Sequence, residues 1–441
     1  MQAVVLSILL TTAATGADAW PGFLGAGAAR EPAKAPLEWS PTKNIAWTAE
    51  LPGYGQSSPV VWKDLVFLTS VEGPMKDTYH ILALRQSDGS QVWRHSFEST
   101  DKVKSSLYVS RAAPTPVCDD KGVYAFFESG DVVGMTHEGK VLWQRSLSQE
   151  FGKFESNHGL AASPVQTDSA VIILVDHSGP SYLIAIDKQT GKTLWKTDRT
   201  SRTSWSSPAL VPVGKGQQVV CSSAGSVDGY DPATGERLWT MDDIGGNTAA
   251  TPLPFAPGRF LIGASPGREG GERAQQSTRS NVAVTIDQVD GKSSPRILWT
   301  AQKATPSFGS PMVHAGHAYW VNRVGAVYCF DAATGESRYT ERTKQSVWAT
   351  PIGVGDRIYL FGKEGTTTVL AAGPEFKVLA ENELWDPSLI KPDEAAIAAE
   401  ETEERRQAAR QNSGPVQYGV AAVNGDFLIR TGTKLYSVRQ E

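Results

Sequence analysis

Short apolar runs of β type alternate with polar turns along most of the chain. One unit of this pattern spans residues 183–195, LIAIDKQTGKTLW, where an apolar run meets a Thr-Gly turn. A second short run then carries Trp195 four residues after Gly191. Two β-patterned runs around a glycine-containing turn predict a hairpin, in which Gly191 can adopt the positive φ that the turn requires.

This unit recurs at intervals of 40 to 60 residues. The copies end, in most cases on an indole, at Trp93, Trp143, Trp195, Trp239, Trp299, Tyr339 and Leu379. Repetition at this interval with β patterning throughout predicts a propeller or a related array. We expect the large rings to be structural, docking each module onto its neighbour, because they sit at a fixed distance from each turn.

Each repeat opens with a small residue followed by proline. The pairs are Ser58-Pro59, Ala113-Pro114, Ser163-Pro164, Ser207-Pro208, Thr251-Pro252, Ser310-Pro311 and Thr350-Pro351. Proline is tolerated as the first residue of a strand, where its missing N–H breaks no ladder bond. An apolar run follows each pair and leads to the hairpin, so the pattern predicts four strands per repeat.

The two ends of the chain complement each other. Residues 44–51 resemble the last strand of a repeat, with Trp47 at the docking position and nothing before it. The C-terminal runs at 417–423, 426–430 and 433–438 lack a last strand. Joining them in one blade would remove open sheet edges. We therefore predict an all-β fold, an eight-bladed β-propeller of four-stranded blades over residues 44–441, closed by an N-terminal strand in the C-terminal blade.

Three segments depart from the repeat. Residues 20–43 are rich in Gly, Ala and Pro, and we expect an irregular segment laid over the body of the propeller. The insertion at 265–280 is rich in Gly, Arg and Ser, which predicts a loop. The insertion at 386–415 predicts a charged helix, capped by Asp393 and carrying a Glu401–Arg405 pair. This helix is either a solvated surface element or a docking element for a partner.

Composition excludes several classes of partner. The 441 residues include 40% hydrophobic and 20% charged residues, with a net charge of -5, which is ordinary for a soluble globular protein. A chain with this balance has no basic footprint for nucleic acid or for an anionic membrane. The three cysteines, Cys118, Cys221 and Cys329, are far apart, so we expect buried apolar fillers and no metal site. We expect a monomer.

The first 19 residues read as a secretory signal. An apolar run covers residues 3–10, and Ala17-Asp18-Ala19 fits the small-x-small cleavage pattern, although no Lys or Arg precedes the run. No later run approaches the ~20 apolar residues of a transmembrane helix. We therefore expect an exported protein, periplasmic or extracellular.

The blade consensus Ala-x-Asp-x-x-Thr-Gly-x-x-x-Trp resembles the pyrroloquinoline-quinone (PQQ) type of propeller repeat. The opening at residues 20–25, WPGFLG, is similar to secreted bacterial members of that quinoprotein-like superfamily. The resemblance implies one of two classes: dehydrogenases that use PQQ and Ca²⁺ in the central funnel, or non-enzymatic BamB-like scaffolds. The dehydrogenases typically carry an adjacent Cys-Cys pair, which this chain lacks.

These observations favour an exported non-catalytic binding or scaffold propeller in the cell envelope, with a protein partner or small ligand at the funnel face. We assign no catalytic residue, cofactor or metal ligand. The alternatives are a PQQ- and Ca²⁺-dependent alcohol or sugar dehydrogenase and a carbohydrate-binding propeller.

The loops that lead into the innermost strands offer candidate ligand-binding residues. The residues three positions before each opening proline are Gln56, Arg111, Ala161, Trp205, Ala249, Phe308 and Trp348, and Tyr418 takes this place in the last blade. Aromatic rings with a guanidinium suit a flat ligand, a sugar or a peptide anchor. The alternative is that Trp205, Phe308, Trp348 and Tyr418 simply fill the mouth of a wide channel.

A second candidate cluster is Glu155, Asn157 and His158, in a long loop before the third repeat. The mixture of carboxylate, amide and imidazole permits a metal or acid–base role, and hydrogen-bonded turn chemistry is the alternative. By contrast, an Asp recurs at one hairpin position of several repeats, for example Asp187 and Asp231. A single active site needs no such repetition, so we assign these Asp residues to the turns.

Overall fold

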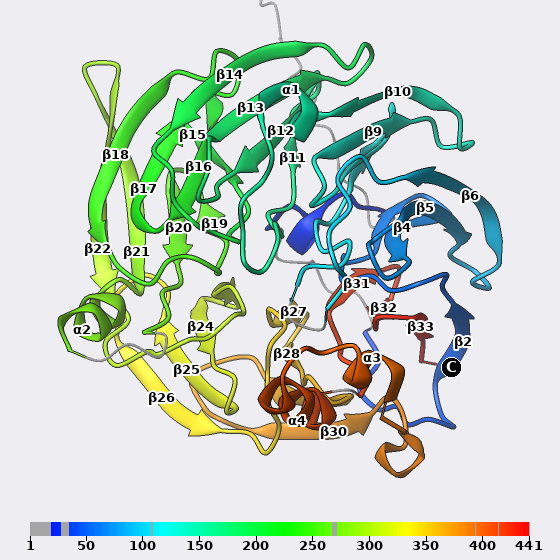
Figure 1. Ribbon diagram of the computed structural model, residues 1–441. Helices are drawn as coiled ribbons and strands as arrows, with labels where there is room; N and C mark the ends of the chain where they lie inside the picture. Colours follow the sequence, from blue (N-terminus) through cyan, green and yellow to red (C-terminus); the bar gives the residue numbers. More distant parts are fainter. Residues whose placement is uncertain are drawn as a thin grey trace, which may run out of the picture.

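A computed structural model describes residues 19–27, 35–106, 109–266, 271–392, 394–412 and 414–440. Eight antiparallel sheets stand around a common axis as the blades of a closed ring (Figure 1). The predicted eight-bladed, all-β propeller is therefore confirmed. The predicted secretory segment lies outside the described residues except for Ala19.

Blades 1 to 4 each contain consecutive strands, which follow one another from the channel outward. Blade 1 has β3 (Val60–Trp62), β4 (Leu65–Glu72), β5 (Thr78–Arg85) and β6 (Gln91–Glu98); blade 2 has β7 (Val117–Asp119), β8 (Gly122–Phe126), β9 (Asp131–Met135) and β10 (Val141–Ser146). Blade 3 has β11 (Val165–Gln166), β12 (Ala170–Val175), β13 (Ser181–Asp187) and β14 (Thr193–Arg199); blade 4 has β15 (Ala209–Val213), β16 (Gly216–Ser223), β17 (Gly225–Tyr230) and β18 (Arg237–Ile244).

The next three blades repeat this order. Blade 5 has β19 (Leu253–Ala256), β20 (Arg259–Ile262), β21 (Val282–Val289) and β22 (Lys292–Thr300); blade 6 has β23 (Met312–His314), β24 (His317–Val321), β25 (Ala326–Asp331) and β26 (Ser337–Arg342). Blade 7 has β27 (Ile352–Val354), β28 (Arg357–Phe361), β29 (Thr366–Ala371) and β30 (Val378–Glu383).

Blade 8 joins the two ends of the chain. Its strands are β31 (Gly419–Val423), β32 (Asp426–Arg430), β33 (Lys434–Val438) and, outermost, the N-terminal β2 (Ile45–Glu50). β2 pairs antiparallel with β33, and Trp47 lies opposite Ser437. The predicted closure is confirmed, and it pairs the edges that both ends would otherwise expose.

The repeated indoles lie between successive blades, as predicted. Trp143 of blade 2 lies against the hairpin glycine of blade 3, where a Cβ added to Gly191 would come within 2.6 Å of the ring. Its Nε1 donates to Lys188 O in the same hairpin, at 2.8 Å. Trp47, Trp93, Trp195 and Trp299 make the corresponding bond to the next blade. Each indole thus fixes the hairpin of its neighbour by packing and by one hydrogen bond.

Blade 5 departs from this rule because its hairpin carries a four-residue insertion. Nothing lies within 4 Å of a Cβ built on Gly291, so no indole covers this turn. Trp239 instead donates to Gln218 Oε1 of its own blade and stacks on Phe260 of blade 5, with ring centroids 6.4 Å apart. In blade 6, Tyr339 replaces the indole and contacts Phe376, with centroids 5.6 Å apart.

The hydroxyl before each opening proline links neighbouring blades in a belt around the channel. Each belt residue donates its backbone N–H to the hydroxyl oxygen of the next blade, at 2.9–3.0 Å. The series runs from Ser58 through Thr115, Ser163, Ser207, Thr251 and Ser310 to Thr350. Six inter-blade bonds result, and the belt stops at blade 8, where hairpin register places Gly419 at this position.

Residues 19–27 lie inside the channel, which corrects the expectation that the whole N-terminal segment is laid over the body. Residues 35–43 do pack on the body, where Trp39 contacts Tyr359 of blade 7 and Phe427 of blade 8. β1 (Ala19–Trp20) pairs with β3, the innermost strand of blade 1, and the 3-10 helix η1 (Phe23–Gly27) follows it near the centre of the ring (Figure 1). Cys118 N donates to Pro21 O at 2.9 Å, which ties the segment to blade 2. Residues 19–27 therefore form a plug at the hub of the propeller.

The plug explains the composition of WPGFLG. Trp20 is only 3% exposed, and Gly25 adopts a φ of 59° against its ring. A Cβ on Gly25 would lie 2.8 Å from the indole, so glycine is required both for its conformation and for its size. Phe23 and Leu24 reach toward the inner strands of several blades.

The other helices lie in insertions. The short α1 (Leu147–Phe151) follows blade 2, and α2 (Glu272–Arg279) occupies the insertion for which the sequence predicted a loop. The predicted single helix at 386–415 is instead η2 (Pro387–Leu389), α3 (Glu394–Ala398) and α4 (Glu403–Asn412); its expected cap, Asp393, lies outside the described residues. Glu401 pairs with Lys104 at 2.9 Å, so this insertion reaches from blade 7 to the loop between blades 1 and 2.

Candidate functional site

Four of the predicted mouth residues, Ala249, Phe308, Trp348 and Tyr418, line one cavity beside the channel axis. Phe308, Trp348 and Tyr418 surround it together with Trp20 and Phe23 of the plug. Phe308 and Trp348 are in contact, with ring centroids 5.2 Å apart, and Phe308 is 48% exposed. The cavity has a volume of about 150 Å³. The sequence did not predict that the plug residues belong to this site, although their WPGFLG motif at residues 20–25 stands out as a family feature.

Arg111 lies on the other side of Tyr418. Its guanidinium carbon is 3.4 Å from the centroid of the Tyr54 ring, and Tyr54 shares a 2.6 Å hydrogen bond with the hydroxyl of Tyr418. Arg111 Nε is buried without a hydrogen-bond partner among the described residues. Burial raises the pKa of Tyr54 well above its usual value, so its hydroxyl stays protonated. An aromatic arc with one guanidinium thus runs from blade 6 to blade 2.

The belt corrects the register of two predicted positions. In blade 2 the belt hydroxyl is Thr115, which precedes a second proline, Pro116, so Ala113 rather than Arg111 is the structural equivalent of Trp205. In blade 8 the hairpin register makes Gln417, not Tyr418, the equivalent of Trp348. Counting three residues back from the opening proline gave the wrong position in both blades. Blade 2 has two prolines, of which the first, Pro114, is not the one after the belt hydroxyl, and blade 8 has no opening proline.

A buried ion pair supports the backbone around Arg111. Lys76 Nζ lies 3.2 Å from Glu128 Oε1, and both side chains are almost fully buried. Lys76 also donates to Ser110 O, and Glu128 accepts from Ala112 N at 3.0 Å. The residues on both sides of Arg111 are therefore held by one pair, which fixes where the guanidinium lies.

Arg430 is a second buried arginine near the mouth, and it has no carboxylate partner among the described residues. Its Nη1 donates to Ser57 Oγ at 2.8 Å, while Nη2 has no partner. Burial lowers its pKa to about 9. Nothing in the sequence indicated this residue, because a lone arginine at a strand end looks like a solvated one.

Trp205 lies on the opposite wall and contacts the loop of Glu155, Asn157 and His158. Its Nε1 donates to Gly159 O at 2.9 Å, and its ring centroid is 5.8 Å from that of His158. The side chains of Glu155, Asn157 and His158 are exposed. The backbone of Glu155 is fixed by its N–H, which donates to His177 Nδ1 at 3.0 Å. The two predicted clusters thus meet at this wall.

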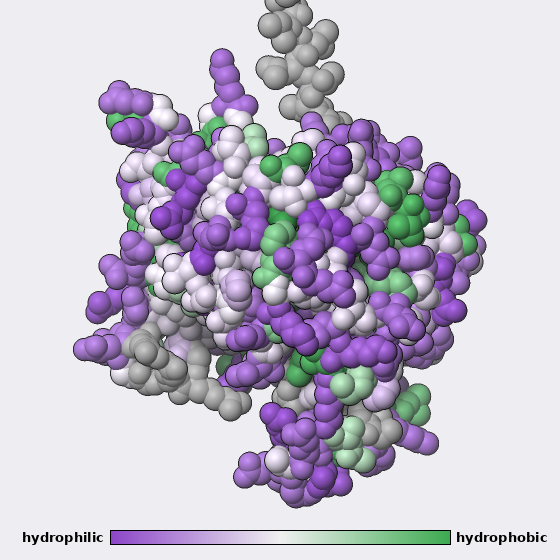
Figure 2. Space-filling model, turned by 45° about the horizontal axis from the view of Figure 1, so that its top comes forward, coloured by the Kyte–Doolittle hydropathy of each residue, from purple (hydrophilic) through white to green (hydrophobic). Residues whose placement is uncertain are grey.

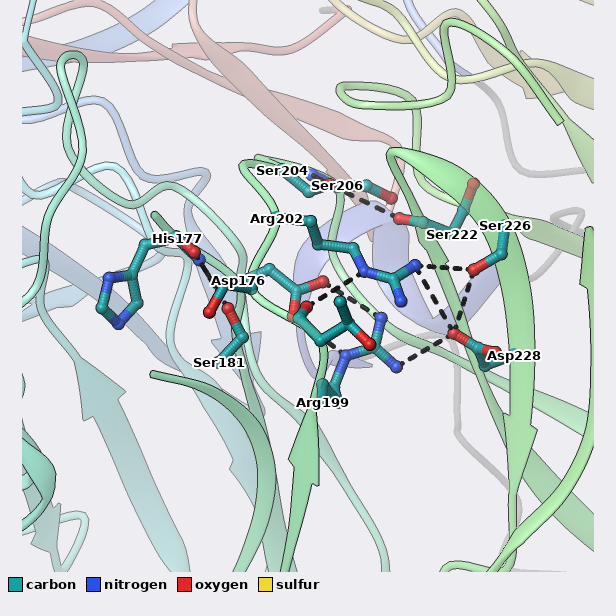
Figure 3. Close-up of polar contacts among 12 residues, drawn as sticks. Asp176, His177, Ser181, Arg199, Arg202, Ser204, Ser206, Ser222, Ser226 and Asp228 are labelled. Carbon is teal, nitrogen blue, oxygen red and sulfur yellow. Dashed lines mark hydrogen bonds and ion pairs between the residues drawn. The ribbon is translucent and has the colours of Figure 1, made fainter. Parts of the chain in front are cut away.

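A network of buried arginine and aspartate side chains joins blades 3 and 4 (Figure 3). Arg199 binds Asp176 through two hydrogen bonds of 2.9 and 3.1 Å and lies 3.2 Å from Asp228. Arg202 donates to Ser226 and lies 3.9 Å from Asp228. Because each carboxylate faces a guanidinium, the network is compensated and serves to fix the two blades.

Asp187, Asp231 and Asp331 have the turn role that the sequence predicted, whereas Asp287, in the hairpin with the insertion, pairs with Arg296 instead. Asp187 Oδ1 accepts from Thr190 N at 2.8 Å and from Gln189 N at 3.2 Å. The hydroxyl of Thr190, which also donates to Oδ1 at 2.7 Å, and these N–H groups lower the pKa of Asp187. Asp231 and Asp331 make the same bonds in their blades.

Figure 2 shows a mainly hydrophilic surface on which apolar residues form small separate groups. The described part of the chain contains no helix with the length and apolar character needed to cross a membrane. Nor does it bring together three His, Cys, Asp or Glu side chains that could hold a metal ion.

Comparison with known proteins identifies the family. The sequence profile described as "Outer membrane protein assembly factor BamB" matches residues 37–179, 153–252 and 279–374, more than half of the chain. The chain belongs to this BamB-like family of PQQ-type propellers. The predicted resemblance is thereby confirmed.

Curated BamB relatives match part of the chain. BamB of Burkholderia pseudomallei is 26% identical over 219 residues, 49% of this chain and 52% of that protein. BamB of Yersinia pestis is 23% identical over 273 residues, 59% of this chain and 63% of that protein. The match thus spans about half to two thirds of the BamB relatives' length.

Solved structures agree on the fold. BamB from Moraxella catarrhalis superposes with a TM-score of 0.56 at 12% identity, covering 89% of this chain and 98% of that one. Quinohemoprotein alcohol dehydrogenase from Comamonas testosteroni gives 0.56 at 11% identity, covering 96% and 81%. The fold is therefore shared with a protein named as an assembly factor and with an alcohol dehydrogenase, and it does not choose between the two functions.

Proposed function

We propose that this protein is an exported, non-catalytic binding or scaffold propeller of the cell envelope, which contacts a protein partner through the face around the channel mouth. The observation that carries the proposal is membership of the BamB family, whose curated relatives are named as outer membrane assembly factors. Export is supported by the small-x-small pattern at residues 17–19 and stays a prediction.

The mouth has the chemistry of a protein-binding surface. An exposed aromatic, Phe308, sits beside Trp348 at the rim of a cavity, and Arg111 and Tyr54 stack nearby. Aromatic residues and arginine are the side chains most often found at the energetic centre of protein interfaces. Residues 19–27 lie in the channel and line two pockets, so a partner meets a face with pockets at its centre.

A PQQ-dependent dehydrogenase is the alternative, and one observation favours it. Polyvinylalcohol dehydrogenase of a Pseudomonas species is 22% identical over 202 residues, 42% of this chain and 29% of that enzyme. Against it stand the three separate, buried cysteines, which offer no adjacent Cys-Cys pair. A carbohydrate-binding role stays a prediction that Trp348→Ala on a glycan array can test.

Titration with PQQ and Ca²⁺ separates the scaffold from the enzyme. Purified full-length protein is titrated while absorbance and tryptophan fluorescence are recorded, and dye-linked oxidation of alcohols is then measured. The proposal expects no stoichiometric binding and no dye reduction. Tight one-to-one binding together with alcohol oxidation would refute the scaffold and establish the alternative.

A further inference from the structure

The belt of hydroxyls leaves two unpaired ends, and both line the cavity at the mouth. Ser58 Oγ accepts none of the six belt bonds, and Thr350 N donates none, because Gly419 of blade 8 has no hydroxyl to link them. No other hydrogen bond to either atom is formed within the described residues. Ser58 and Thr350 lie in the cavity wall with Gly419 between their blades.

Gly419 cannot be replaced by a residue that completes the belt. A Cβ at this position would lie 2.2 Å from Ser58 Oγ and 2.5 Å from Ser58 Cα. The gap is therefore built into the closure of the ring between blades 8 and 1. It leaves a hydroxyl oxygen, on a residue that is only 6% exposed, as an unused acceptor, and a backbone N–H as an unused donor.

The rest of the cavity wall is mainly apolar and aromatic, with Ser310 and His314 as further polar residues. Trp20, Phe23 and Leu24 of the plug line it from the axis, and Phe308, Trp348 and Met312 line it from blades 6 and 7. Its volume of about 150 Å³ equals that of an engineered cavity large enough to hold benzene. Such a wall favours a single planar ring, and the exposure of Phe308 leaves a side open to solvent.

We infer that this cavity binds a phenolic ring, whose hydroxyl donates to Ser58 Oγ or accepts from Thr350 N–H. A hydroxyl is the polar group suited to both ends of the belt, since it donates one hydrogen bond and accepts others. The ring is supplied by a free phenol or by a tyrosine side chain of a partner. The tyrosine alternative rests on the proposed function, and it specifies which side chain of the partner the mouth would recognise.

The test uses the full-length protein, 4-methylphenol as probe and toluene as the probe without a hydroxyl. Isothermal titration calorimetry should show one saturable site, with affinity for 4-methylphenol at least about tenfold above that for toluene. Ser58→Ala should reduce this preference to less than about threefold. A site filled only by water would show no saturable binding of either probe and would overturn the inference.

Two matched variants locate the site. Ala249→Phe places a ring in the cavity wall and should lower the affinity for 4-methylphenol at least about tenfold. Ala161→Phe makes the same change at the equivalent position of blade 3, outside the cavity, and should leave the affinity unchanged. Equal losses in both variants would contradict the assignment.

A last comparison separates the two sources. N-acetyl-tyrosinamide carries the same ring on a peptide backbone. If it binds at least as tightly as 4-methylphenol, the source is a partner side chain; if it binds more than about tenfold more weakly, the source is a free phenol. If neither 4-methylphenol nor N-acetyl-tyrosinamide binds, the proposed phenol site is refuted. The proposed scaffold function is not affected by that result, because the PQQ titration tests it separately.

Discussion

Two buried arginines differ in how their charge is compensated. Arg199 lies between the carboxylates of Asp176 and Asp228, whereas Arg430 has neutral partners only. Removing one member of a buried pair leaves the other charge uncompensated, which costs far more than removing a charge that has no partner. The contrast allows a prediction at the scale of single residues.

Arg199→Met should lower the free energy of unfolding by about 3–5 kcal/mol, because it leaves two buried carboxylates without their shared cation. Arg430→Met should change it by less than about 1.5 kcal/mol, since the lost hydrogen bonds are offset by relief of an uncompensated charge. Urea denaturation of both variants measures the difference. Equal losses would show that compensation is not what distinguishes them.

The buried imidazole of His177 leads to a prediction on pH. Burial lowers the pKa of His177 below its usual value of 6.5, and its Nδ1 accepts from Glu155 N and Gly179 N. The unfolded chain therefore binds the proton more tightly than the folded one, so stability is full above pH 6.5 and falls as pH decreases below it. His177→Asn, whose Oδ1 can accept the same N–H groups, should reduce this fall.

Thermal melts between pH 7.5 and 5 check this expectation. His80 and His95 also have lowered pKa values through burial, so part of the pH dependence should remain in the variant. An unchanged slope in His177→Asn would contradict the role assigned to His177.

At the scale of elements, the belt and the plug hold the blades together near the axis. The belt lets the innermost strands of adjacent blades share hydrogen bonds, although strands of different sheets do not pair. The plug fills the centre that eight blades leave open. Both act where the blades come closest, while the indoles act farther out, at the hairpins.

Ser163→Ala should cost about 1–3 kcal/mol, because it leaves the buried N–H of Thr115 without an acceptor. Ser58→Ala is the matched control: its hydroxyl accepts no belt bond, so its cost should be at least about 1 kcal/mol smaller. Chemical denaturation compares the two. A larger loss for Ser58→Ala would show that the belt does not carry the effect.

Gly25→Ala tests the plug against Gly214→Ala, which has nearly the same φ, 60° against 59°. Nothing lies within 4 Å of a Cβ at Gly214, whereas the Trp20 ring lies 2.8 Å from one at Gly25. Both variants bear the cost of a left-handed alanine, about 1–2 kcal/mol, and only Gly25→Ala adds a clash. We expect faster hydrogen exchange at residues 19–27 in Gly25→Ala alone.

The sequence predicted most of the elements and few of their contacts. Regular spacing of glycine and tryptophan was sufficient for the blades, and the orphan strand at Trp47 was sufficient for closure. The place of residues 19–27 could not be predicted, because nothing local distinguishes a segment inside a channel from one on the surface. A helix at 272–279 was missed because Gly and Ser at the start of the insertion dominate its composition.

The candidate site was predicted in part for a related reason. Phe308, Trp348 and Tyr418 were placed at one mouth because the ring brings all the loops of one face together. Tyr54, Arg430 and the open end of the belt were not found, since each depends on a neighbour from another blade. Six of the seven small residues before an opening proline are Ser or Thr. A strand that begins with proline does not require a hydroxyl there, so this regularity was the sequence signal for the belt.

At the scale of the whole molecule, the proposed function assigns partner binding to the channel mouth and not to the outer strands of the blades. The mouth carries the exposed ring of Phe308, the half-buried rings of Trp348 and Tyr418, and a cavity. The outer strands carry single aliphatic residues such as Leu194, which is 51% exposed. Isolated apolar residues on outer strands are ordinary, while a clustered aromatic mouth marks a binding face.

Site-specific photo-crosslinking in cells of the source organism tests most directly whether the mouth is the partner-binding face. A photoreactive phenylalanine analogue is placed at Phe308 in the mouth and, as a control, at Leu194 on an outer strand. The account predicts one discrete crosslinked envelope protein from position 308, lost when Trp348→Ala is added, and none from position 194. Adducts from position 194 alone, or none from position 308, would contradict it.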